Sequence, residues 1–126
     1  MINSIAAFLS YLGVAILLLG AFMAIYVQIT PYKEFKLIAQ GNAAAAISLS
    51  GAVLGFTFPL LASIYYTQSL LEMTIWAGIT CIVQLLVFTV MRHWAKHIED
   101  GVLAPAIILA ALSMSVGLLN AVSISH

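Results

Sequence analysis

Charge is what this sequence lacks most. Only 6% of its 126 residues are Asp, Glu, Lys or Arg and 64% are hydrophobic, whereas about a quarter of the residues in a soluble domain are charged. A water-soluble chain of this size leaves much of its surface exposed and cannot hide so much apolar area. The charges also balance to zero, so composition predicts no attraction for nucleic acid. A lipid bilayer is therefore the expected surrounding of most of the chain.

Other absences narrow the class of protein further. The single cysteine, Cys81, cannot form an internal disulfide. The first residues lack the cations of a secretory signal peptide, and the apolar stretch behind them is longer than a signal core, so we expect a retained span. The sequence contains no GxSxG elbow, phosphate-binding glycine loop or HExxH motif. We therefore expect neither an enzyme nor a bound cofactor.

What the sequence does contain is four long apolar stretches. A helix needs about 20 apolar residues to cross roughly 30 Å of hydrocarbon, and residues 5–27, 43–66, 70–91 and 102–123 meet that requirement. A short polar patch at residues 66–69 fits a tight hairpin between the second and third stretches. The prediction is an all-α polytopic membrane protein with four transmembrane helices, folded as one domain over residues 1–126.

The charged residues lie in the two longer connections. Residues 30–41 and 92–101 hold all four Lys and Arg residues, and an even number of spans places both loops on one side. The positive-inside rule assigns that side to the cytoplasm. Both termini are then predicted to lie outside, with His126 as an unstructured end. The two loops are also where a cytoplasmic partner would bind.

Short polar residues and a proline mark the expected helix ends. Asn42 and Asp100 stand just before the second and fourth stretches, where a side-chain acceptor can cap free N–H groups. Pro105 falls in or near the first turn of the fourth helix, where its missing N–H does little harm.

His93 and His97 lie one helical turn apart if the third helix continues beyond the membrane. Histidines at this spacing can bind a metal, but a structural zinc site needs four ligands in fixed geometry. We favour an interfacial helix end here, and predict no metal.

A repeat at an offset of 60 residues indicates an internal duplication. The pattern Ile38-x-x-Gly41 recurs as Ile98-x-x-Gly101, and further matches follow in the second and fourth stretches. Two helical hairpins, residues 1–66 and 67–126, would then have equal orientation and form a parallel repeat about an axis along the membrane normal.

The polar residues at membrane depth are uncharged, which argues against a proton-coupled mechanism. The candidates are Gln84, Asn120, Ser113 and Thr57. In one interpretation these side chains only bond across helix interfaces, each contributing about 0.6–2 kcal/mol. In the other, Gln84 and Asn120 line a path for a solute.

The second helix contains Gly51, Gly55 and Pro59. Pro59 cannot donate to the carbonyl of Gly55, so a bend is expected between them. The GxxxG spacing allows another helix to approach closely, or the freed carbonyl could face a cavity. The fourth helix has a similar small-residue face, and we predict homo-oligomerisation through one of these two helices.

Several stretches resemble a known family. Residues 30–38 and 41–46 are similar to the first loop and second helix of YjfL-like bacterial inner-membrane proteins, the DUF350 family. Three further motifs resemble it in the same order: Ser50-Gly51-x-x-Leu54-Gly55-x-x-x-Pro59-Leu60, Gln84-Leu85-Leu86-Val87-Phe88 and Gly117-x-x-Asn120-Ala121. The resemblance implies a four-helix protein of the bacterial inner membrane, but no established activity, substrate or catalytic residue.

Two classes of function follow from these features. The first is a helix-packing scaffold or accessory membrane subunit, which suits the short loops and the small-residue faces. The second is a small oligomeric transporter or channel for an uncharged or cationic solute, with Gln84, Asn120 and the Gly55–Pro59 bend at its centre. A polar cavity reaching both amides would favour transport, and dry packing would favour the scaffold.

Overall fold

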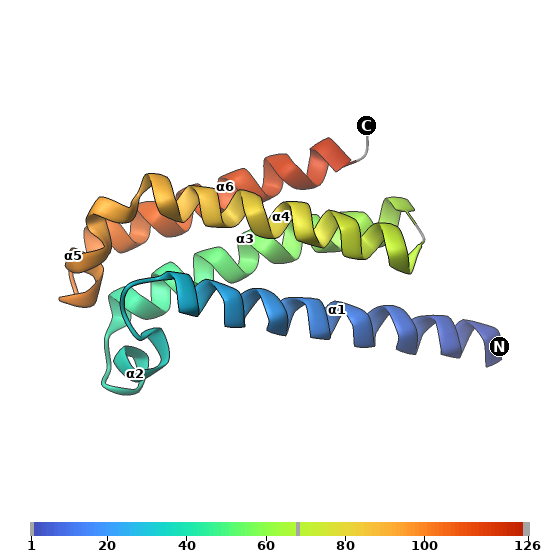
Figure 1. The fold of residues 1–126 in the computed structure, drawn as a ribbon, viewed down its shortest axis with the longest axis horizontal. Coiled ribbons are helices and arrows are strands. Elements are labelled where there is room, and N and C mark those ends of the chain that lie inside the picture. The colour runs from blue at the N-terminus through green and yellow to red at the C-terminus, as the bar shows by residue number, and fades with distance from the viewer. Residues whose placement is uncertain (1, 68, 125–126) are drawn as a thin grey trace.

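The protein is entirely helical over the residues described by its computed structural model, 2–67 and 69–124. The helices are α1 (Ile2–Ile29), α2 (Glu34–Ala39), α3 (Ala43–Thr67), α4 (Leu70–Val90), η1 (Arg92–Trp94), α5 (Ala95–Glu99) and α6 (Leu103–Ile124) (Figure 1). The helices α1, α3, α4 and α6 are long and apolar enough to cross a membrane. The four predicted spans are therefore confirmed, with ends that differ by at most a few residues. His126 and residue 68 of the predicted hairpin patch lie outside the described residues.

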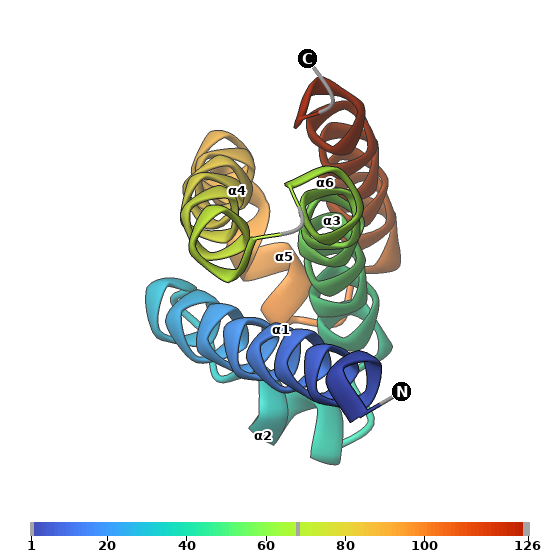
Figure 2. The ribbon, with the colours of Figure 1, turned by 90° about the vertical axis from the view of Figure 1, so that its right-hand side faces the viewer.

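The central helix of the bundle is α3. It packs most extensively on α6 and also contacts α4 and α1, and the end-on view in Figure 2 shows α1 set apart from the other three. The most apolar window of α3 is 56% buried, while that of α1 is only 6% buried. Three helices thus form the packed core, and α1 lies along its side.

Glycines bring the backbones of α3 and α6 into contact. A Cβ atom added to Gly51 would lie 2.3 Å from the Cα of Ala110, and one added to Gly117 would lie 2.3 Å from the carbonyl oxygen of Gly55. No side chain fits at that distance, so only glycine permits this approach. The expectation that these faces hold two copies together needs correction, because α3 and α6 of the same chain already cover each other. Homo-oligomerisation itself stays a prediction.

Pro59 lies inside α3, which continues to Thr67. The Gly55 carbonyl, left without its usual donor by Pro59, meets the backbone of Gly117, where a Cα hydrogen points at the oxygen. This carbonyl therefore faces the adjacent helix, and the predicted bend stays a prediction.

The helix ends confirm one predicted cap and correct another. The Oδ1 of Asn42 accepts from the N–H of Ala45 at 3.0 Å, as predicted. Asp100 does not cap α6, because it ends α5 and the chain still turns through Gly101 and Val102 before α6 begins. Pro105 lies in the first turn of α6, also as predicted. An unpredicted cap is Ser69, whose Oγ accepts from the first turn of α4.

The same turn ends α2 and α5. Gly41 and Gly101 have positive φ angles of +88° and +85°, which glycine adopts without a Cβ clash. In both turns the glycine N–H bonds the carbonyl three residues back, and the next N–H bonds the carbonyl five residues back. The two copies of the Ile-x-x-Gly motif in the predicted repeat therefore adopt one local geometry.

Replacing Gly117 by alanine should destabilise the bundle, because the new methyl group meets the Gly55 carbonyl of α3 rather than a side chain that can move. We expect a loss of about 1–3 kcal/mol, as for other overpacked cores, measured as a lower melting temperature in detergent. Gly78→Ala is the matched control, since nothing lies within 4 Å of its Cβ position. Equal melting temperatures for the two variants would contradict the backbone contact.

Candidate functional site

Gln84 connects three helices inside the membrane. Its side chain on α4 is 1% exposed, and its Nε2 donates to the backbone carbonyl of Ser113 on α6 at 3.1 Å. A Cβ at Gly55 of α3 would lie 2.7 Å from the same nitrogen. The amide oxygen Oε1 is buried without a hydrogen-bond partner. Gln84 therefore lies in close packing between three helices, with one acceptor that has no hydrogen-bond partner.

Of the other predicted polar residues, Ser113 joins this group through its backbone carbonyl, whereas Asn120 and Thr57 do not. Asn120 donates from Nδ2 to the hydroxyl of Thr80 at 3.3 Å, which makes a second link between α6 and α4. Thr57 bonds the Val53 carbonyl of its own helix at 2.7 Å. Thr80 was not predicted, although its position one turn before Gln84 places both on the same face of α4. The structure thus separates the predicted intramembrane set into two α4–α6 links and a lone threonine.

A second polar group lies where α1 meets α2, and sequence reasoning missed it. Glu34 is only 1% exposed, although it stands between lysines in a segment that reads as a solvated loop. The helix α1 ends at Ile29, and the chain turns through Thr30 and Pro31 before α2 begins at Glu34. The Oε1 of Glu34 makes a close contact with Thr30 Oγ1, and its Oε2 is buried without a partner.

We call this group the carboxyl corner. Its members are Tyr26, Thr30, Tyr32, Glu34 and Ser48. The hydroxyl of Tyr32 lies 3.5 Å from that of Ser48 on α3, and the hydroxyl of Tyr26 is buried without a partner. Burial raises the pKa of Tyr32 to about 12, although the contact with Ser48 opposes the shift. Burial likewise raises the pKa of Glu34, against the opposing effect of its bond to Thr30.

One signal could have revealed the corner from the sequence. Tyr26, Thr30 and Glu34 follow one another at intervals of four residues, the spacing of one helix face. The interruption at Pro31 hides the pattern, because proline favours a helix boundary there.

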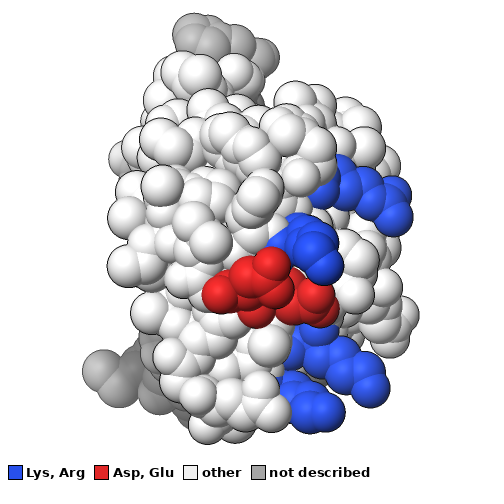
Figure 3. All heavy atoms as spheres, turned by 90° about the vertical axis from the view of Figure 1, so that its left-hand side faces the viewer, with Lys and Arg blue, Asp and Glu red and all other residues white. Residues whose placement is uncertain are grey.

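Charged side chains gather at the end of the bundle formed by α2 and α5 (Figure 3). Asn42 connects the two charged loops, since its Nδ2 donates to the carbonyls of Ile98 and Glu99 at 3.3 and 3.0 Å. Beside this link lies a polar pocket, lined by Pro31, Tyr32, Arg92, His93, Ala95, Lys96 and Glu99. Over residues 2–67 and 69–124, no three His, Cys, Asp or Glu side chains gather as a metal site would require.

Comparison with known proteins places these features in a family context. The UPF0719 inner membrane protein YjfL of Escherichia coli K12 is 29% identical over 124 residues, which cover 95% of this chain and 94% of that protein. The UPF0719 transmembrane protein YshE of Bacillus subtilis is 34% identical over 85 residues, or 68% of this chain and 63% of that protein. No solved structure matches the chain.

These relatives and the four spanning helices identify a multi-pass protein of the bacterial inner, or plasma, membrane. The model of a family described as a Domain of Unknown Function, DUF350, matches residues 1–124. The chain therefore belongs to the DUF350 family.

Proposed function

We propose that this protein is a membrane scaffold or accessory subunit that acts through helix contacts, and not an enzyme. The observation that carries the proposal is the position of α1, which is long enough to span the membrane while only 6% of its most apolar window is buried. The core of α3, α4 and α6 packs without α1 along most of its length. A spanning helix held so loosely is available to a partner.

The face of α1 turned away from the core is built for close helix contact. Its exposed residues recur at spacings of three and four: Ala6, Ser10, Gly13, Leu17, Gly20 and Ala24. No atom lies within 4 Å of the Cβ positions of Gly13 and Gly20. Small residues at such spacings let a second helix approach closely, and van der Waals packing then stabilises the pair in lipid.

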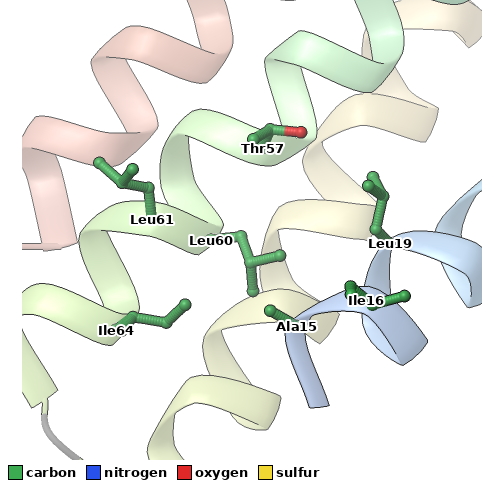
Figure 4. A pocket seen from close by; sticks show the side chains of 7 residues that line it. All are labelled: Ala15, Ile16, Leu19, Thr57, Leu60, Leu61 and Ile64. Carbon is green, nitrogen blue, oxygen red and sulfur yellow. The ribbon is translucent and has the colours of Figure 1, made fainter. Parts of the chain in front are cut away.

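The opposite face of α1 is attached mainly near its C-terminal end. There Phe22 stacks on Phe56 of α3, with ring centroids 4.4 Å apart, and Tyr26 meets Phe88 of α4 edge-on at 5.7 Å. Closer to the N-terminus, an open apolar groove of about 250 Å³ separates α1 from α3 (Figure 4), lined by Ala15, Ile16, Leu19, Thr57, Leu60, Leu61 and Ile64. From residue 3 to residue 21, α1 thus has no fully buried residue, and it contacts the core through partly buried side chains such as Tyr11, Val14 and Leu18.

We infer that the partner of α1 is a second copy of this chain. In a homodimer, Gly13 and Gly20 of the two copies would face each other, so the exposed face of α1 would be covered in both copies. This proposal replaces the expected contact through α3 or α6, whose small residues are used inside the chain.

Replacing Gly13 and Gly20 together by leucine should dissociate the assembly, because the added side chains separate the helices. The mass of the protein in detergent, measured by light scattering, should fall from that of a dimer or larger assembly to that of a monomer. Gly78→Leu on α4 is the matched control and should leave the mass unchanged, since its Cβ position is also open. A monomeric wild type, or a mass that the double variant leaves unchanged, would refute α1 as the contact.

One observation favours the alternative, a small oligomeric transporter or channel for an uncharged or cationic solute. The buried Oε1 of Gln84 lacks a donor, and a solute or water could supply one in another state. The test is flux of solutes and ions into liposomes, with Gln84→Leu/Asn120→Leu as the comparison. We expect no flux from the wild type. Flux that the double variant abolishes would replace the scaffold proposal with transport.

We further propose that the two charged loops face the cytoplasm and can bind a partner there. The helices α2 and α5 lie at one end of the bundle, and both termini lie toward the other (Figure 1). Lys33, Lys36, Arg92 and Lys96 belong to this end, which the positive-inside rule assigns to the cytoplasm. The similar turns at Gly41 and Gly101 support two parallel hairpins with equal orientation.

A reporter fused after residue 126 tests this orientation. Alkaline phosphatase, which is active only outside the cytoplasm, should be active in the fusion, and a fluorescent protein that requires the cytoplasm should be dark. The opposite pair of results would reverse the orientation and assign the charged loops to the outer side.

A further inference from the structure

The carboxyl corner contains a buried acidic side chain, one oxygen of which has no hydrogen-bond partner. Glu34 is 1% exposed, and its Oε2 lacks any hydrogen-bond partner. The groups that favour its charged form are the Thr30 hydroxyl and its own backbone N–H. Burying an ionised carboxylate without a partner is costly enough that such groups usually neutralise instead. The charged form of Glu34 is therefore the unfavourable one in this fold.

The end of α1 makes the charged form still less favourable. The last carbonyls of a helix lack helical donors and carry partial negative charge, and α1 ends at Ile29 beside the corner. The carbonyl of Val27 and that of Tyr32 lie 3.2 and 3.4 Å from Thr30 Oγ1. Thr30 can donate its one hydrogen to Oε1 of Glu34 or to either carbonyl. When it donates to a carbonyl, it has a lone pair for a donor from Glu34.

We propose that Glu34 is a proton-binding site, in which the protonated carboxyl donates to Thr30 Oγ1 and Thr30 donates to a carbonyl at the end of α1. The folded protein keeps this proton at pH values where a free glutamate has lost it. On release, the proton passes to water at the membrane interface, and the carboxylate that remains is stabilised by water that enters the corner. No other bond forms or breaks in this step.

The groups around Glu34 reinforce this assignment. Tyr26 of α1 and Tyr32 interact with it electrostatically, and both are phenols that add negative charge if they ionise. Ser48 of α3, which contacts Tyr32, is neutral, and Glu99 of α5 acts on Tyr32 with the same sign as Glu34. A proton suits this corner better than a metal ion, because Oε2 of Glu34 is closed off from any further ligand.

The site lies where α1 is attached to the core. Tyr26 belongs both to the corner and to the aromatic contact with Phe88, so water entering beside Glu34 also loosens this attachment. Protonation of Glu34 would then strengthen the attachment of α1 to the core, and loss of the proton would weaken it. The inference stands on the corner alone and does not require α1 to be a dimer contact.

The first test compares thermal unfolding of the full chain in detergent between about pH 5 and about pH 8 for wild type and Glu34→Gln. The folded state holds a proton that the unfolded chain releases above its ordinary pKa, so rising pH favours unfolding until it passes the folded pKa. We expect the wild-type melting temperature to fall by several degrees. The amide introduced by Glu34→Gln imitates the protonated carboxyl at every pH. The melting temperature of this variant should therefore not show that decrease.

Glu72→Gln is the matched control, because Glu72 is an exposed acid at the other end of the bundle. It should keep the wild-type dependence on pH. The same change of melting temperature with pH in wild type and Glu34→Gln would overturn the proposal. Repeating the wild-type measurement near pH 8 in sodium, potassium and choline chloride separates a proton from an alkali ion. A higher melting temperature in sodium or potassium than in choline would assign the site to a metal ion instead.

A second measurement does not depend on the Glu34 variant folding. The chain has four acidic residues, so replacing Glu72, Glu99 and Asp100 by their amides leaves Glu34 as the only acidic side chain. We expect the infrared C=O band of a protonated carboxyl in this variant to persist well above the pH at which free glutamate ionises. Loss of the band at the pH of a free glutamate would refute a retained proton.

Discussion

The backbone contact between α3 and α6 is the constraint on which the rest of the fold depends. Lipid offers no hydrophobic force between helices, so the bundle must gain stability from close packing and from polar bonds. Gly55 and Gly117 supply the packing, and the closeness they permit brings Gln84 within reach of the Ser113 carbonyl. The close packing around Gln84 is a consequence of this contact.

The same contact explains why α1 is set apart. The helices α6 and α4 make the larger contacts with α3, and the fully buried residues of α1 are confined to its C-terminal part, near Phe22 and Tyr26. The carboxyl corner forms at this end because the chain turns there from α1 into α2, next to the aromatic contact of Tyr26. The least buried spanning helix, α1, therefore ends beside the buried acid Glu34.

The sequence predicted what depends on composition and local chemistry, and failed where the answer depends on tertiary partners. The four spans follow from hydropathy, and the Asn42 cap follows from its own side chain. The spacing of Gly51 and Gly55 predicted a close helix contact but could not say that the other helix belongs to the same chain. From the sequence alone, Glu34 is expected to be a solvated loop residue, because its burial depends on residues of other helices, which the local sequence does not reveal. Asp100 does not cap α6 because the turn before α6 is two residues longer than expected.

The contact between Gly55 and Gly117 also has a consequence for the order of synthesis. The two glycines are 117 − 55 = 62 residues apart in the chain, so a ribosome adding about 5–20 residues per second makes the second on the order of 3–12 s after the first. The glycine face of α3 is therefore made before the helix that covers it in the folded protein. Insertion of each helix and assembly of the bundle are thus separated in time, and the last helix to enter completes the tightest interface.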